Sequence, residues 1–328
     1  MNLRLALYRL AAEHRLDAQA CDTLAQCAGL DRQPADVARR VAQGMAVLAA
    51  ALIGVGLVSW VAANWQGMSR FARFGLLQAV VLALCAGAAW RPGARGPLAL
   101  LAFLAVGALF ASFGQTYQTG ADPWQLFATW ALLCLPLALA VRSDVLWAPW
   151  ALVAMTAVSL WLHAHTGHRW QVKPQDLGAH ALAWSAALAL VLALGPRASR
   201  WTGAGPWARR TAVTLAVTLL TGSALGALFH APVAPHYALG LFLLAAASAA
   251  LSRPRSFEVY GLGAAALGVN TLMVAGLARW LLGDPDPGEP IGRLLLIGLA
   301  AAGLLAATVQ WVLRQARCAA QASTKERR

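Results

Sequence analysis

The side chains with the most evident chemistry are histidines gathered in one short segment. HAHTGH, residues 163–168, contains His163, His165 and His168. Neutral imidazole binds zinc and related ions, and carboxylates often complete such sites. The spacing is not the i, i+4 pair of an HExxH helix, and no acid follows at a catalytic interval. Two interpretations therefore stand: a metal or proton-handling site, or amphipathic side chains at a membrane surface.

A second polar segment joins two apolar runs. Residues 107–130, GALFASFGQTYQTGADPWQLFATW, contain no lysine or arginine. The polar side chains of this hairpin would form a surface for a small ligand or a partner: Gln115, Tyr117, Gln118, Asp122 and Trp124. The alternative is a polar turn, shaped by Gly120 and Pro123, that only satisfies its own backbone.

Within the apolar runs the polar side chains are uncharged. Asn270 lies near the middle of one run. Threonines recur at helical spacing in another run: Thr211, Thr214, Thr218 and Thr221. They would line a path for a solute, or join helices by hydrogen bonds worth about 0.6–2 kcal/mol each. The GxxxG pair Gly222 and Gly226 favours packing, and the position of Glu258 at the end of a run argues against an ion-coupled pump.

The composition defines the environment of these residues. Of the 328 residues, 59% are hydrophobic and 12% are charged, whereas a soluble domain carries roughly 25% charged residues. About 20 apolar residues in a helix cross the ~30 Å hydrocarbon core, and the apolar runs approach this length. The alternation over ~10 residues that is typical of transmembrane strands is absent. The sequence therefore predicts an all-α, polytopic transmembrane helical bundle.

We expect three parts along the chain: a cytoplasmic helical region over residues 1–41, a transmembrane bundle over 42–313 and a basic cytoplasmic tail over 314–328. The bundle is expected to contain about ten spans. They are Ala42–Ala62, Ala72–Trp90, Pro97–Phe113, Trp124–Val141, Val145–Leu162, Gly178–Leu194, Thr211–Phe229, His236–Leu251, Val259–Leu282 and Ile291–Leu313. In the first part, Asp17 is expected to cap a helix, and Pro34 to begin a helix that runs into the first span.

Basic residues set the orientation of the bundle. With the N-terminus in the cytoplasm, 20 of the 26 Lys and Arg residues fall on the cytoplasmic side and 6 on the outer side. This asymmetry predicts that both termini are cytoplasmic. The net charge of +13 thus reflects membrane topology, and we expect no nucleic acid partner. Histidines at the outer face are then His163, His165, His168, His180, His230 and His236.

Two further patterns concern the spans. Tryptophans near span ends are expected to form interfacial belts: Trp60, Trp65, Trp90, Trp124, Trp147, Trp161, Trp201, Trp280 and Trp311. The letters GALF occur at residues 107–110 and again at 226–229, each time at the outer end of a span. Spans two to five would then correspond to spans six to nine as a parallel repeat.

One stretch resembles a known family. GQTYQTGADPWQLFATWALLCLPLALA combines an FGQ-Y core, an acidic turn and an LF-x-x-W helix, and an Ala/Gly-rich first span ends near Asn64 and Trp65. These features resemble the bacterial multi-pass membrane proteins catalogued as domain of unknown function 2157, over residues 1 to about 150. The resemblance implies a bacterial inner-membrane location and a companion membrane protein. It carries over no catalytic residue.

Three functions remain after these observations. The absence of a catalytic or cofactor motif favours a non-enzymatic integral membrane protein, without a cofactor, that assembles with partners or supports the envelope. The alternative is a transporter or channel for a neutral or amphipathic small solute, which the repeat favours. The third is a membrane-embedded enzyme with histidine and aspartate side chains at the outer face.

Overall fold

The computed structural model describes residues 10–14, 16–28, 35–63, 69–117, 120, 122–167, 172–253, 257–283 and 290–325. Within these ranges the chain is helical and contains no strand. The predicted all-α bundle is therefore confirmed.

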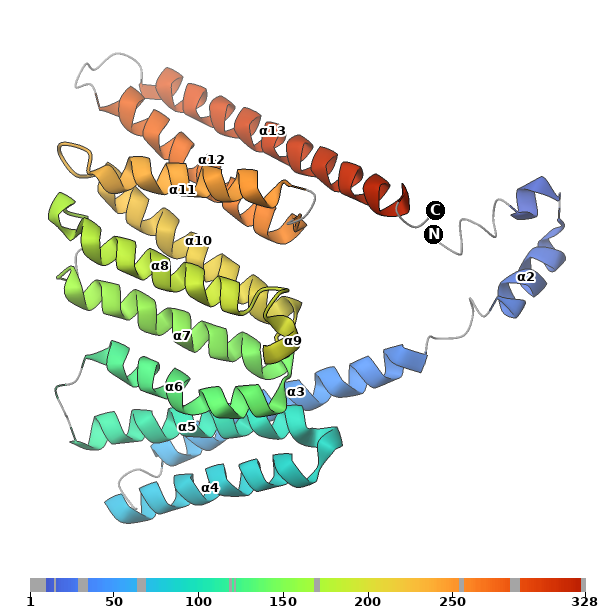
Figure 1. The fold of residues 1–328 in the computed structure, drawn as a ribbon, viewed down its shortest axis with the longest axis vertical. Helices are drawn as coiled ribbons and strands as arrows, with labels where there is room; N and C mark the ends of the chain where they lie inside the picture. The colour runs from blue at the N-terminus through green and yellow to red at the C-terminus, as the bar shows by residue number, and fades with distance from the viewer. Residues whose placement is uncertain are drawn as a thin grey trace.

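In the described part of the chain, ten helices of 17 residues or more make up the bundle (Figure 1). They are α3 (Ala35–Ala63), α4 (Arg70–Trp90), α5 (Arg95–Tyr117), α6 (Pro123–Val141), α7 (Asp144–His165), α8 (Leu177–Ala193), α10 (Pro206–Leu228), α11 (Pro235–Leu251), α12 (Val259–Leu282) and α13 (Pro290–Lys325). The short elements are α2 (Ala18–Cys27), η2 (Pro92–Ala94), η3 (Pro174–Asp176) and α9 (Ser199–Thr202).

Successive long helices are antiparallel, so the bundle has two distinct ends (Figure 1). Helices α5, α7 and α10 end, and α6, α8 and α11 begin, at one end of the bundle, which we call the hairpin end. α3 begins and α13 ends at the opposite end, which we call the terminal end. Both ends of the bundle's chain therefore leave it on the same side.

Seven helical segments in the described ranges are long and apolar enough to cross a membrane. The prediction of about ten spans is therefore corrected to about seven. The other apolar stretches are Pro235–Leu251, which is the whole of α11, and Val41–Gly56 and Phe74–Trp90, which are parts of α3 and α4. A helix of 17 residues, such as α11, is about 25 Å long, which is less than the ~30 Å hydrocarbon core. The predicted segments themselves are correctly placed, since each lies on a helix to within one residue.

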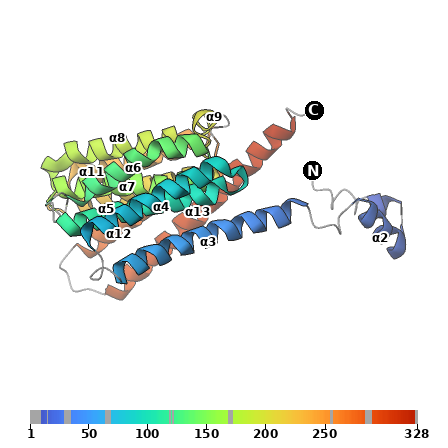
Figure 2. The same ribbon diagram turned by 90° about the horizontal axis from the view of Figure 1, so that it is seen from below.

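The outer parts of the chain are also helical. Asp17 accepts a hydrogen bond at 2.8 Å from the Ala20 amide at the start of α2, which confirms the predicted cap. The bundle was predicted to begin at residue 42 and to end at residue 313. α3 runs through the first of these boundaries and α13 through the second, so neither boundary coincides with the end of a helix. Figure 2 shows α3 and the C-terminal part of α13 extending beyond the other helices at the terminal end.

α7 and α10 lie at the centre of the bundle. α7 packs against α6, α8 and α10, and α10 also packs against α8, α11 and α12. Within the first half, α5 contacts α4, α6 and α7, and α6 contacts α7. Within the second half, α10 contacts α8, α11 and α12, and α11 contacts α12. This is the correspondence of helix pairs that the parallel repeat requires, and the sequence repeat itself stays a prediction.

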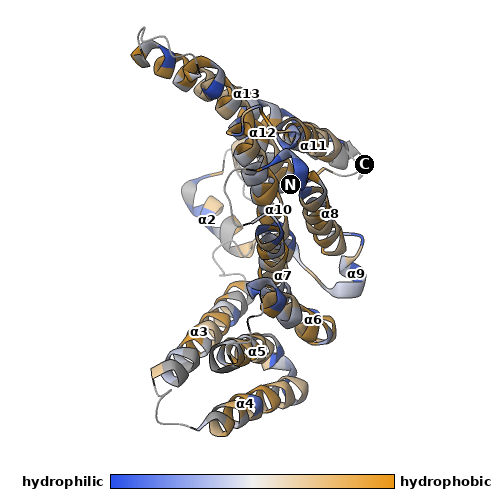
Figure 3. Cartoon of the chain, turned by 90° about the vertical axis from the view of Figure 1, so that its left-hand side faces the viewer, coloured by the Kyte–Doolittle hydropathy of each residue, from blue (hydrophilic) through white to orange (hydrophobic). Residues whose placement is uncertain are grey.

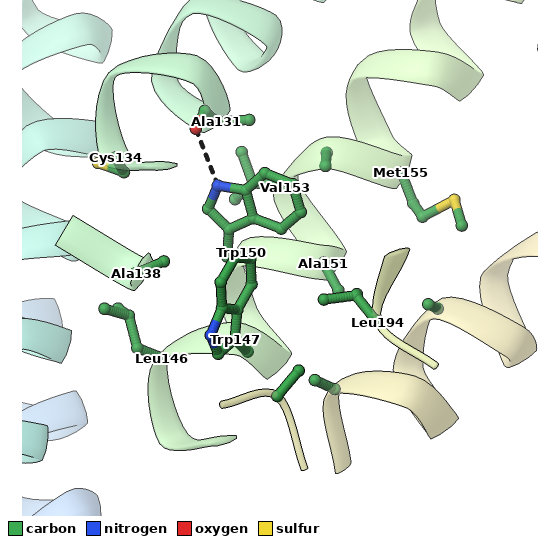
Figure 4. Close-up of a cluster of buried hydrophobic side chains, with 14 of the residues drawn as sticks. Ala131, Cys134, Ala138, Leu146, Trp147, Trp150, Ala151, Val153, Met155 and Leu194 are labelled. Atoms are coloured by element: carbon green, nitrogen blue, oxygen red, sulfur yellow. Dashed lines mark hydrogen bonds between the residues drawn. The ribbon is translucent and has the colours of Figure 1, made fainter. Parts of the chain in front are cut away.

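The largest buried cluster lies around two tryptophans of α7 (Figure 4). The Trp150 indole N–H donates to the Ala131 carbonyl of α6 at 2.8 Å, and the Trp147 N–H donates to the Thr202 carbonyl at 2.7 Å. The two rings meet edge to face, with centroids 5.1 Å apart. Trp147 is only 2% exposed, so its predicted place in an interfacial belt is wrong. Trp90, Trp201 and Trp280 are largely exposed near helix ends, as belt residues should be.

Hydrophobic residues predominate along the long helices (Figure 3). Leu132 and Leu133 of α6, and Leu295 and Leu299 of α13, are at least 60% exposed. Contiguous apolar surface of this kind is stable against hydrocarbon and not against water. The helices are therefore membrane-embedded and contact the lipid bilayer.

A carboxylate connects the two halves at the terminal end. Asp144, the first residue of α7, accepts hydrogen bonds from the backbone amides of Gly205, Trp207 and Ala208 at 2.8–3.0 Å. These amides lie at the start of α10, where backbone amides have no acceptor within their own helix. The negative charge also lies at the positive end of the α10 dipole. Asp144 therefore fixes α10 against α7 where the two halves meet.

Candidate functional site

The hairpin end brings together two of the segments that the sequence singled out. Trp124, in the first turn of α6, has its ring centroid 6.3 Å from that of His165 at the end of α7. His165 stacks on Trp161 at 4.4 Å. The Trp124 indole N–H is buried and has no hydrogen-bond partner among the described residues. One residue of the predicted hairpin surface therefore lies against one residue of HAHTGH.

The other hairpin residues are only partly described. Gln115 and Tyr117 lie in the last turn of α5, and their side chains are outside the described structure, as is Gln118. Asp122 is an exposed residue at the start of α6, and its carboxylate makes no capping hydrogen bond. The ligand or partner surface across this hairpin stays a prediction.

The histidines of HAHTGH do not converge on one point in the described part of the chain. His165 makes a 2.8 Å ring-to-carbonyl hydrogen bond with Trp161, and His168 lies outside the described residues. Among the residues that are described, no three His, Cys, Asp or Glu side chains are placed to hold a metal ion. Metal binding by His163, His165 and His168 therefore stays one of the two interpretations that the sequence left open.

Asn270 lies at a contact between two helices. It is 8% exposed on α12, and its amide donates to the Thr308 hydroxyl of α13 at 3.0 Å. The Thr308 hydroxyl in turn donates to the Asn270 carbonyl oxygen at 3.1 Å. This reciprocal pair satisfies polar groups of both helices inside the bundle. The arrangement is the helix-joining geometry that the sequence left as one of two interpretations.

The threonines of α10 do not follow Asn270 along one path. Thr214 is exposed and shares a 2.6 Å hydrogen bond with the Tyr260 hydroxyl of α12. Thr218 is also exposed. Thr221 faces α12, where its hydroxyl would lie 2.9 Å from a Cβ added at Gly268. These threonines therefore lie on the lateral surface of α10 and at its contact with α12, whereas Asn270 faces α13.

Sequence reasoning missed a pair of buried histidines at the hairpin end. His180 lies in the first turn of α8, and His236 is the second residue of α11. Their ring centroids are 4.6 Å apart, with the ring planes at 80°. The Trp184 ring contacts both, at 6.0 Å from His180 and 6.2 Å from His236. We call these three residues the histidine pair and its tryptophan.

The polar atoms of this group are removed from solvent. His180 is 3% exposed and His236 is fully buried. His180 Nδ1 lies 3.0 Å from the Asp176 carbonyl oxygen, which can only accept, so Nδ1 carries the proton and Nε2 a lone pair. Neither ring nitrogen of His236 has a partner among the described residues, and neither has the Trp184 indole N–H.

Only a weak sequence signal marks this pair. Asp176 and His180 are one helical turn apart, and His236 directly follows a proline that begins a helix. Both histidines were placed at the outer face by the charge asymmetry. Which of the six outer histidines meet depends on the packing of α8 against α10 and of α10 against α11, and no local pattern contains that information.

The geometry of the bundle can now be compared with known proteins. Residues 8–147 match the family model described as Predicted membrane protein (DUF2157). The match ends at the start of α7 and confirms the resemblance seen over residues 1 to about 150. Its description gives a membrane location and no activity. Comparison with curated proteins and with solved structures found no match.

Proposed function

We propose that this membrane protein is a non-enzymatic component of a bacterial inner membrane, which assembles with a companion membrane protein or supports the envelope. Three features support this function: apolar lateral surfaces, polar side chains that join helices, and short connections between the helices. The family description is consistent with it, because it states a membrane protein without an activity.

The observation that carries the proposal is the pair of Asn270 and Thr308. The Asn270 side chain donates one hydrogen bond to Thr308 of the neighbouring helix α13 and accepts one from it. This polar group near the middle of α12 is thus used to hold two helices together.

The alternative function is transport of a neutral or amphipathic small solute. It is favoured by the matching sets of helix contacts in α4–α7 and α8–α12, because many transporters consist of two structural repeats. In that case the path of the solute would run between these two sets of helices and would pass Thr221 at the contact of α10 with α12.

Thiol labelling separates these two functions. We would replace all five native cysteines and introduce single cysteines by Asn270→Cys and Thr221→Cys. Cells are then treated with a membrane-impermeant thiol reagent. We expect no labelling at either position, because both side chains lie at contacts between helices. Folding of each variant is checked by size-exclusion chromatography.

Two further cysteines calibrate the labelling. Asp122→Cys, at an exposed position of the hairpin end, should react, and Thr218→Cys, on the lateral surface of α10, should stay unreacted against lipid. Labelling of a folded Asn270→Cys variant at a rate near that of Asp122→Cys would mean that water reaches the centre. The transport function would then replace the assembly function.

We also propose that both termini are cytoplasmic. The two ends of the bundle's chain lie at the terminal end (Figure 1), and the excess of basic residues supports the cytoplasm for that side. A fluorescent protein that folds only in the cytoplasm, fused after Arg328, should fluoresce. A phosphatase that is active only in the periplasm should be silent at the same position, and activity of that fusion would contradict the orientation.

A further inference from the structure

We propose that Arg210 binds the headgroup phosphate of an anionic phospholipid at the terminal end of the bundle. Helices α10 and α12 both begin at this end and pack against each other (Figure 1). Trp207 and Arg210 lie in the first turns of α10, and Tyr260 is the second residue of α12. We call Trp207, Arg210 and Tyr260 the arginine clamp.

Two aromatic rings hold the guanidinium of the arginine clamp. The Arg210 guanidinium carbon lies over both rings, 5.3 Å from the centroid of Trp207 and 5.4 Å from that of Tyr260. Both distances fall within the ~6 Å range of cation–π contacts. The Tyr260 ring is itself fixed, because its hydroxyl shares a 2.6 Å hydrogen bond with Thr214. The protein alone therefore keeps the positive charge in one place.

The charge of Arg210 has no counter-charge in the described part of the chain. Its Nε is buried without a hydrogen-bond partner, whereas the neighbouring Arg209 pairs with Glu258 at 3.0 Å. Glu258 also accepts from the Gly261 amide, and Asp144 accepts three amides at the start of α10. A guanidinium that is partly removed from water and unpaired is stabilised by an anion from outside the chain.

The position of Arg210 along α10 indicates the source of that anion. α10 has 23 residues and is about 34 Å long, slightly more than the ~30 Å hydrocarbon core. Arg210 is its fifth residue, so it lies near the boundary between hydrocarbon and headgroups. Trp207 and Trp201 are 65% and 76% exposed at the same end, as interfacial tryptophans are. The phosphates of this layer belong to lipids, and basic pockets between membrane helices bind them.

The choice of an anionic lipid follows from charge and shape. The planar fork of a guanidinium donates two parallel N–H bonds to phosphate oxygens. Phosphatidylglycerol has a net negative charge, whereas the choline of phosphatidylcholine cancels the charge of its phosphate. Leu267 lies two turns beyond Tyr260 on the same face of α12 and is 55% exposed. It provides apolar surface for an acyl chain of the lipid whose headgroup Arg210 binds.

The test is lipid binding by the purified full-length protein in detergent. Phosphatidylglycerol and phosphatidylcholine with the same acyl chains are added separately, and the thermal midpoint of unfolding is measured. We expect phosphatidylglycerol to raise the midpoint of the parent more than phosphatidylcholine does. Arg210→Gln should lose at least half of this difference. The number of lipids retained in native mass spectrometry should fall in the same variant.

Two matched controls each remove one positive charge from the same end. Arg200→Gln changes an exposed side chain, and Arg209→Gln changes a guanidinium that is already paired with Glu258. Both variants should keep the response of the parent to phosphatidylglycerol. Inorganic phosphate should cause no rise, because it lacks the acyl chains that lie against the helices.

Two milder variants cover the case in which Arg210→Gln does not fold. Arg210→Lys keeps the charge without the planar fork, and Trp207→Leu removes one ring of the clamp at an exposed position. Each should lose part of the response to phosphatidylglycerol, and a full response of both would overturn the site.

Three further results would also contradict lipid binding by Arg210. They are an equal response of the parent to both lipids, an equal loss in the glutamine variants of Arg200, Arg209 and Arg210, and a rise with inorganic phosphate as large as with phosphatidylglycerol. The second result would indicate general attraction to a basic surface. The third would indicate a site for free phosphate.

Discussion

Asp144→Ala should lower the free energy of unfolding by about 2–4 kcal/mol. The carboxylate accepts three backbone hydrogen bonds at the start of α10, and alanine would leave three amides without this partner, of which those of Gly205 and Ala208 are partly buried. The loss would fall at the contact between the two halves, where α7 meets α10. The measurement is thermal unfolding of the purified protein in detergent, followed by circular dichroism.

Asp122→Ala is the matched control for this prediction. Asp122 also stands at the start of a membrane helix, but it is exposed and its carboxylate makes no capping bond. Its replacement should change the stability by less than about 0.5 kcal/mol. Asp144→Asn should lie between the parent and Asp144→Ala, because it keeps one acceptor and loses the charge. Equal stability of Asp144→Ala and Asp122→Ala would refute the role of Asp144.

Gly107→Ala should destabilise the contact between α5 and α6 by about 1–3 kcal/mol. A Cβ at this position would overlap the six-membered ring of Trp130. That ring cannot withdraw freely, because its indole N–H donates to the Phe103 carbonyl at 3.0 Å and it packs on the Phe103 ring at 4.9 Å. Thermal unfolding and the yield of monodisperse protein would both report the loss.

Gly222→Ala, in contrast, should not destabilise the protein. A Cβ at Gly222 meets no atom within 4 Å, so alanine should be neutral or should stabilise α10 by up to about 1 kcal/mol. If Gly107→Ala were as stable as Gly222→Ala, the close approach of α5 to Trp130 would not exist in the folded protein.

Features with a local cause could be predicted from the sequence. The helical segments follow from long apolar runs, and the cap by Asp17 follows from its place before a helix. The span count was too high, and hydropathy alone did not separate full spans from a shorter apolar helix such as α11, which has 17 residues.

Features that depend on packing could not be predicted. Trp147 stands near a span end in the sequence, but the loop before α10 folds over it and buries it, with only 2% exposed. His180 and His236 are far apart in the chain and meet only because α8 and α11 both pack on α10. Likewise, the partner of Asn270 is Thr308, a residue that no pattern in the sequence associated with it.

The central claim is that Asn270, a polar side chain within the bundle, joins α12 to α13 through Thr308. A double-mutant cycle on Asn270→Ala and Thr308→Ala tests it most directly, because it isolates the energy of the pair from the cost of each replacement. From the two reciprocal hydrogen bonds we expect a coupling energy of about 0.6–1.7 kcal/mol in unfolding experiments in detergent. Additive effects, with a coupling near zero, would show that Asn270 and Thr308 do not hold α12 to α13 and would contradict the account.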